Sequence, residues 1–145
     1  MYKRHKWLIR VIFFISLVLS YWFNADYNKI AEPAINVTAI AIGIYTAAVS
    51  SILGSDYSRR LASITSREFK CKTLLGVLYE YLHWAGMLSL SSIILSVLFL
   101  SDMIPIGGIL RKSLSAVSYG IFLVNLILFG LIFMFLIRSL NKALR

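Results

Sequence analysis

Cysteine, proline and acidic residues are scarce in this chain. Of its 145 residues, one is cysteine, two are proline and six are acidic. The single cysteine, Cys71, excludes a disulfide within the chain. The two histidines and six acids show no metal-ligand spacing, and there is neither a glycine-rich phosphate loop nor a nucleophile beside a base. We therefore expect no metal site, no cofactor and no enzymatic activity.

Long apolar stretches take up most of the sequence. Hydrophobic residues make up 59% of the chain and the mean hydropathy is +0.81, which is more apolar than soluble domains usually are. A helix of about 20 residues crosses the hydrocarbon layer of a membrane, and four stretches approach or exceed that length: 7–23, 34–54, 73–100 and 117–137. We predict an all-α, polytopic membrane protein, a four-transmembrane-helix bundle that forms one domain over residues 1–145.

Basic residues are distributed unequally between the two ends of the predicted bundle. The N-terminal segment, the loop at residues 55–72 and the C-terminal tail together hold twelve lysines and arginines, against three in the other two loops. Short loops rich in lysine and arginine stay in the cytoplasm. We therefore expect an inner-membrane protein with loop 55–72 and both termini in the cytoplasm.

The net charge of +9 has the same explanation. Basic residues at helix ends orient a membrane protein and contact anionic lipid headgroups. We thus expect membrane lipids as partners and no direct binding of nucleic acid, although strongly basic chains also include nucleic-acid binders.

The second predicted span carries a stripe of small residues that recur every four positions, at Ala39, Gly43, Ala47 and Ser51. Such a stripe lies on one helix face and lets two helix backbones approach closely, which drives helix association in lipid. This helix should therefore lie at a packed centre, either within the chain or at the interface of a homo-oligomer. A pore-lining role is a third alternative, because small and hydroxylated residues also border water-filled paths.

The third predicted span contains the only acid within a span, Glu80, with His83 one turn later on the same face. A carboxylate deep in a membrane is costly and marks a functional site, so the two residues are candidates for gating or for relaying protons. At headgroup depth Glu80 would instead be interfacial and structural. A strip of small and polar residues lies beside this pair, at Ala85, Ser89, Ser92 and Ser96.

The fourth predicted span has one strongly polar residue in its interior, Asn125. A lone asparagine in a span typically makes a hydrogen bond to another helix. We include Asn125 among the candidate gating residues. The rest of this span is leucine, isoleucine and phenylalanine, which suit a helix that faces lipid.

The loop at residues 55–72 is both basic and amphipathic. Tyr57, Leu61 and Ile64 share one face of a short predicted helix, capped by Ser55 or Asp56, that would lie on the membrane surface. We expect the basic residues to contact lipid headgroups or a soluble cytoplasmic partner protein, the alternative being a solvated turn. These residues are Arg59, Arg60, Arg67, Lys70 and Lys72.

The region at residues 34–100 resembles the RexB family, four-span inner-membrane proteins of the lambda phage exclusion system. The resemblance rests on three features in succession. A helix rich in small residues ends in Leu53-Gly54-Ser55, a basic turn with Arg59-Arg60-Leu61-Ala62 follows, and the next helix carries one acid, Glu80. It implies a bacterial or prophage anti-phage protein that acts as an oligomeric ion channel and depolarises the membrane. It assigns no role to individual residues.

Two other functions fit a short chain of this kind. The first is a non-conducting membrane anchor or sensor that recruits a soluble effector in a multi-protein defence complex, as in the Kiwa system. The second is a holin-like lysis protein, although most holins have fewer spans and a more highly charged tail than residues 138–145 provide.

Overall fold

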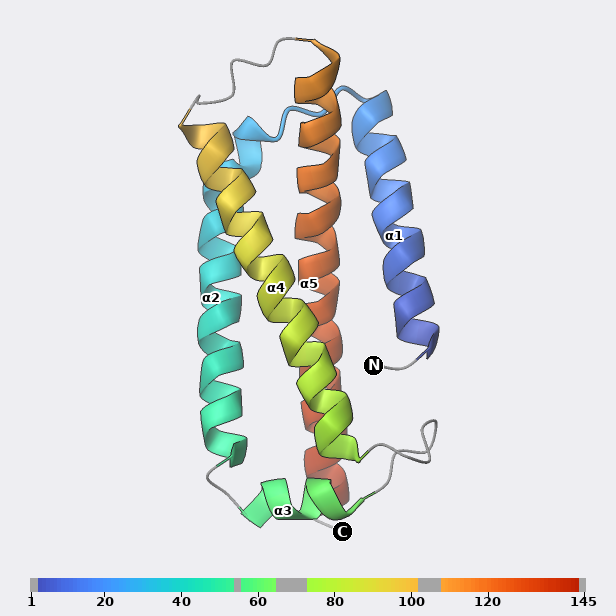
Figure 1. Ribbon diagram of the computed structural model, residues 1–145, viewed down its shortest axis with the longest axis vertical. Helices are drawn as coiled ribbons and strands as arrows, with labels where there is room; N and C mark the ends of the chain where they lie inside the picture. Colours follow the sequence, from blue (N-terminus) through green and yellow to red (C-terminus); the bar gives the residue numbers. More distant parts are fainter. Residues whose placement is uncertain (1–2, 54–55, 65–72, 102–107, 144–145) are drawn as a thin grey trace.

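The structure is a computed structural model that describes residues 3–53, 56–64, 73–101 and 108–143. Over these residues the protein is all-α (Figure 1). Four long helices run along the molecule and one short helix joins two of them. The five are α1 (Lys3–Trp22), α2 (Asn28–Leu53), α3 (Asp56–Ser63), α4 (Leu74–Leu100) and α5 (Ile109–Ala143).

The four long helices have the length and apolar composition needed to cross a membrane. Their candidate spans are Arg4–Trp22, Asn28–Ser50, Leu74–Leu100 and Ile109–Ile137. In hydrocarbon each backbone N–H and C=O must find a partner within the protein, and a helix provides all of these hydrogen bonds internally. The predicted class is therefore confirmed: the chain is an all-α, multi-pass membrane protein with four membrane-length helices.

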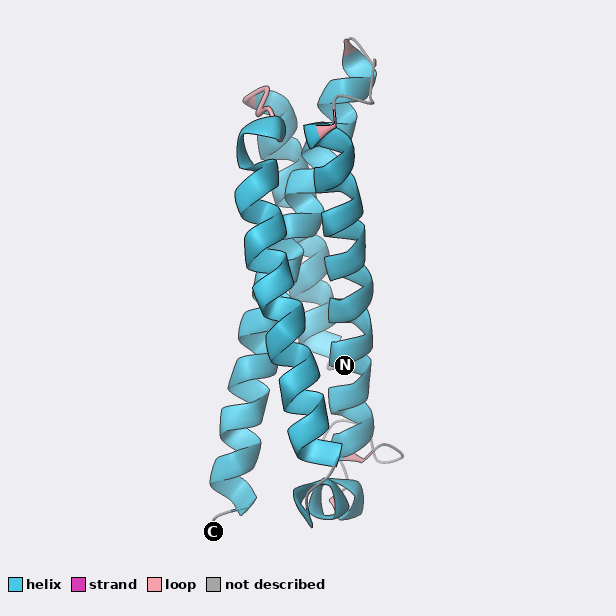
Figure 2. Cartoon of the chain, turned by 90° about the vertical axis from the view of Figure 1, so that its left-hand side faces the viewer, coloured by secondary structure: helices cyan, strands magenta, loops and turns pink. Residues whose placement is uncertain are grey.

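The helices form a row in which each packs mainly against its neighbours. α1 packs against α5, α5 against α4, and α4 against α2. The short α3 lies across the end of the bundle beneath α2 and α4 (Figures 1 and 2). α1 begins and α5 ends toward the end at which α3 lies (Figure 1).

Two expectations about the places of the helices need correction. α2 lies at the edge of the row, so the alternative that places it at a packed centre within the chain is wrong, while its place at an oligomer interface stays a prediction; α5 lies between α1 and α4. The apolar face that suggested lipid contact for the last span is partly internal, because Val124, Leu128 and Ile132 are buried. Apolar composition alone does not distinguish a helix that faces lipid from one that faces other helices.

Three helices begin earlier than the predicted spans, and the first of them, α1, begins at Lys3 instead of residue 7. α2 begins at Asn28, so Pro33 lies inside the helix instead of before it. Pro33 is the sixth residue of α2, beyond the four N-terminal N–H groups that lack helical partners, so its missing N–H removes one backbone hydrogen bond of the helix. α5 begins at Ile109 and includes Arg111 and Lys112 in its first turns. The span was predicted from apolar residues alone, whereas the helix itself continues into the polar residues before them.

A capped turn connects α1 to α2. Asn24 adopts a left-handed conformation with φ 50°, which asparagine tolerates better than most residues. The N–H of Ala25 donates to the carbonyl of Ser20 at 3.0 Å, and that of Asn24 donates to the carbonyl of Tyr21 at 3.3 Å. This pair of bonds is a Schellman motif, which satisfies the last carbonyls of α1 and reverses the chain.

Ser115 of α5 fixes this turn to the rest of the bundle. Its hydroxyl donates to the carbonyl of Ala25 at 2.6 Å and accepts from the N–H of Tyr27 at 2.8 Å. Asp26 lies 3.9 Å from the guanidinium of Arg111, between half-exposed side chains. The turn is thereby held by α5, which follows it by almost ninety residues.

The contact between α1 and α5 depends on Gly120. A Cβ atom at this position would lie 2.9 Å from two ring carbons of Phe13 and 3.3 Å from the hydroxyl oxygen of Ser16. Gly120 therefore lets the backbone of α5 approach the side chains of α1 more closely than any other residue would.

We predict that Gly120→Leu lowers the free energy of unfolding by about 1–3 kcal/mol, the usual cost of overpacking a close contact. Gly130→Leu on the same helix is the control, because nothing lies within 4 Å of a Cβ placed there. Denaturation of the purified chain in detergent micelles measures both. Equal stability of the two variants would contradict the packing described for α1 and α5.

Candidate functional site

A hydrogen bond joins α4 to α5 in the middle of the bundle. The hydroxyl of Ser89 donates to Oδ1 of Asn125 at 2.9 Å, and both side chains are buried. The interhelical hydrogen bond predicted for Asn125 is therefore present. Asn125 also borders a small cavity of about 150 Å³ between α2 and α5, which is otherwise lined by apolar residues.

A second polar contact lies nearer the α1–α2 turn. The hydroxyls of Tyr27 and Ser96 are 2.9 Å apart, and Ser96 also donates to the carbonyl of Ser92 at 2.8 Å. Tyr27 packs edge-on against Phe99 and Tyr119. The small and polar strip predicted on α4 is thus internal, since Ala85, Ser89, Ser92 and Ser96 are all buried.

Three buried hydroxyl oxygens in the described part of the chain have no hydrogen-bond partner: those of Thr38, Tyr45 and Ser92. Such atoms are rare in folded proteins because each loses its hydrogen bonds to water. Thr38 and Tyr45 lie on the buried face of α2. Ala34 and Ala41 lie on the same face, so that buried residues recur every three or four positions, as in a helix with one buried side. Sequence reasoning missed this polar face, although its three- and four-residue spacing was visible.

The small-residue stripe of α2 lies on the opposite, outer side of the helix. Ala39, Gly43 and Ala47 are exposed in the single chain, and a Cβ at Gly43 would meet nothing within 4 Å. Thr46 and Ser50 add exposed hydroxyls that bond to carbonyls of their own helix. The stripe therefore does not serve packing within this chain. The side chain of Ser51 is outside the described part.

Glu80 and His83 lie on α4, about 9 and 14 Å from its first residue at 1.5 Å per residue. Glu80 is half-buried, whereas His83 is exposed and stacks on Tyr79, with ring centroids 6.2 Å apart. His83 therefore faces away from the interior where Asn125 is buried. The three candidate gating residues do not form one internal cluster.

Another histidine, which sequence reasoning missed, does lie against the bundle. Nδ1 of His5 on α1 is hydrogen-bonded to the hydroxyl of Tyr81 on α4. The two rings also make an edge-on contact with centroids 5.8 Å apart. This pair joins the first and third spans near the end at which α3 lies.

The predicted amphipathic helix is confirmed as α3. Leu61 is buried, with 2% of its surface exposed, and packs with Ile52, Leu74 and Leu78. Ile64 was expected on the same face but is 44% exposed, because it follows the last helical residue. Asp56 is the first helical residue and not the cap, and the alternative cap, Ser55, lies outside the described part.

Of the predicted basic contact residues, the structure describes the side chain of Arg59. It is 89% exposed and lies 4.0 Å from Asp56, an equally exposed partner. An exposed ion pair of this kind adds little stability, so the guanidinium remains accessible to other anions. The side chain of Arg60 and all of Arg67, Lys70 and Lys72 lie outside the described part.

Comparison with protein-family models, with curated proteins and with solved structures finds no match to this chain. Three features of the structure bear on function. They are the polar interior around Asn125, the exposed small residues of α2, and the exposed Arg59 on α3.

We predict that Ser89 and Asn125 are energetically coupled by about 1 kcal/mol, as expected for a hydrogen bond between membrane helices. A double-mutant cycle with Ser89→Ala and Asn125→Leu, followed by denaturation in detergent, measures this coupling. Ser91→Ala replaces the first change in the control cycle, because Ser91 bonds to a carbonyl of its own helix. Coupling below about 0.3 kcal/mol in the test cycle would contradict the internal bond.

Proposed function

We propose that this chain assembles into a homo-oligomer in a bacterial inner membrane and conducts ions, so that it lowers the membrane potential as the effector of an anti-phage defence system. One observation supports the homo-oligomer: Ala39, Gly43 and Ala47 on the outer face of α2 are exposed in the single chain. Small residues gain little from contact with lipid chains, but they allow another helix to pack closely.

Conduction requires more than one chain in this proposal. Within one chain the space between α2, α4 and α5 is filled by buried side chains, among them Ala41, Val77, Ala85 and Leu128. An ion needs a polar, hydrated path across the hydrocarbon layer. Copies that meet around their α2 helices would bring the hydroxyls of Thr46 and Ser50 to such a path.

The biological setting of the proposal comes from the RexB resemblance and the charge distribution. Twelve basic residues lie in the two terminal segments and the loop at residues 55–72, which favours the cytoplasm for the end of the bundle that carries α3. A cytoplasmic sensor that responds to infection would then reach the protein at its basic end.

A membrane anchor or sensor is the second candidate, and the exposed surface of α3 favours it. Arg59 and Asp56 are almost fully exposed, while Leu61 holds the short helix against α2 and α4. A charged helix fixed in this way offers a soluble partner a defined surface. In this function the chain carries no current and recruits the effector.

We predict that Gly43→Leu weakens self-association and removes depolarisation, because a leucine side chain keeps the α2 helices of two copies apart. Self-association should weaken at least about tenfold, which corresponds to 1.4 kcal/mol. Gly86→Leu on α4 is the matched control, since neither glycine has a neighbouring atom within 4 Å of a Cβ in the single chain. Cross-linking in native membranes measures self-association.

A voltage-sensitive dye measures membrane potential in bacteria that carry the chain with its neighbouring genes, before and during phage infection. Depolarisation only after infection, lost in Gly43→Leu and kept in Gly86→Leu, supports the proposed channel. Protection with an unchanged potential excludes the channel and supports the anchor. Timed killing without infection supports a holin-like protein instead.

A further inference from the structure

The end of the bundle near α3 contains a groove that the proposed function does not use. It has a volume of about 660 Å³ and opens between the last turns of α2 and the first turns of α4. α4 crosses the bundle obliquely, so it lies close to α2 at one end and diverges from it toward α3 (Figure 1). The groove is the space left by this divergence.

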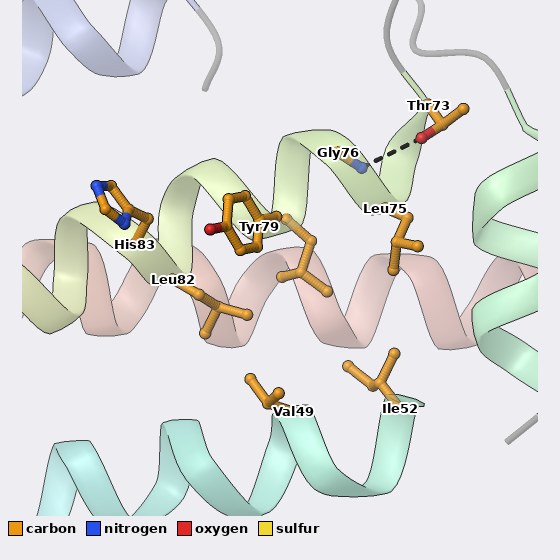
Figure 3. A pocket seen from close by; sticks show the side chains of 9 residues that line it. Val49, Ile52, Thr73, Leu75, Gly76, Tyr79, Leu82 and His83 are labelled. Atoms are coloured by element: carbon orange, nitrogen blue, oxygen red, sulfur yellow. Dashed lines mark hydrogen bonds between the residues drawn. The ribbon is translucent and has the colours of Figure 1, made fainter. Parts of the chain in front are cut away.

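Apolar side chains from two helices face each other across the groove. Val49 and Ile52 extend from α2 toward Leu75 and Leu82 of α4 (Figure 3). At its closed end Ile52 and Leu78 pack with Leu61 of α3. Water would be poorly held by this surface, because it offers few polar atoms.

The open rim is more polar than the floor. Thr73, Tyr79 and His83 line it, and Tyr79 and His83 are exposed. From Thr73 to His83 the groove follows ten residues of α4, about 15 Å at 1.5 Å per residue. It therefore runs from the start of the helix toward the middle of the membrane, parallel to the direction in which an acyl chain lies.

Exposed positive charge lies at the α3 end of the bundle. Arg59 on α3 is 89% exposed and lies 4.0 Å from the equally exposed Asp56. The segment at residues 55–72 carries five basic residues and two acidic ones. Basic surfaces between membrane helices on the cytoplasmic side attract anionic headgroups.

We infer that the groove between α2 and α4 binds one acyl chain of an anionic phospholipid, whose headgroup lies at the α3 end near Arg59. The groove supplies apolar contact for the chain, and the basic end supplies the preference for negative charge. A second copy of the protein is a poorer occupant, because the small-residue face of α2 that would receive it is a different face from that of Val49 and Ile52. The inference does not depend on ion conduction.

Native mass spectrometry of the purified full chain in detergent tests the inference. Phosphatidylglycerol and phosphatidylcholine with identical acyl chains are added in turn, and the bound lipid is counted by mass. We expect one phosphatidylglycerol per chain, with phosphatidylcholine bound at least about fivefold more weakly, since one basic residue near a headgroup contributes about that factor.

Val49→Phe fills the groove and should reduce bound phosphatidylglycerol at least about tenfold. Val97→Phe is the matched control, because Val97 is an exposed valine on α4 outside the groove. Arg59→Gln changes an exposed side chain, so the fold is preserved, and it should remove most of the preference for phosphatidylglycerol. This variant keeps the test decisive even where Val49→Phe fails to fold.

Three results would overturn the inference. They are equal binding of the two lipids, full binding by a folded Val49→Phe variant, and an unchanged preference in Arg59→Gln. A change of oligomeric mass in Val49→Phe with lipid binding intact would assign the groove to a second copy. Lipid binding is measured without membrane potential, and depolarisation is measured without added lipid, so the failure of the lipid site and the failure of the channel are distinguishable.

Discussion

Close approach of α5 to its neighbours holds this bundle together. In lipid there is little hydrophobic force between helices, so association depends on packing and on interhelical hydrogen bonds. α5 supplies both, because Gly120 admits the ring of Phe13 and Asn125 bonds to Ser89. The positions of α1, of α4 and, through α4, of α2 follow from these contacts.

The two faces of α2 differ in a way that bears on function. The inner face carries Thr38 and Tyr45, whose hydroxyls have no partner within the described part of the chain. The outer face carries Gly43 and its small neighbours Ala39 and Ala47, which are exposed, and no described atom lies within 4 Å of a Cβ at Gly43. A helix at the edge of a row, with small residues outward, is suited to be the contact between copies. The groove beside Val49 continues the inner face toward α3, because Val49 follows Tyr45 by about one helical turn.

Hydropathy predicted the four spans because burial of the backbone in hydrocarbon requires long apolar helices. The order of the helices in the row could not be predicted, since lipid-facing and helix-facing residues are equally apolar. Asn125 was identified from its isolation in an apolar span, and its bond to Ser89 followed the expected chemistry. His5, Thr38 and Tyr45 were missed, because a polar residue at a span end or among small residues gives no such contrast. Burial of Ile64 was wrongly predicted because helical periodicity continues past the point at which α3 ends.

The two hydrogen bonds between Ser115 and the α1–α2 turn affect the order in which the helices assemble. Tyr27 and Ser115 are separated by 88 positions in the sequence, and α1 packs mainly against α5, which is synthesised after it. At about 5–20 residues per second, translation takes roughly 4–18 seconds to cover that interval. During this time α1 is in the membrane without its native neighbour, and the turn after it lacks the hydroxyl that fixes it. α1 is therefore synthesised well before it can dock, and its docking waits until α5 has been made.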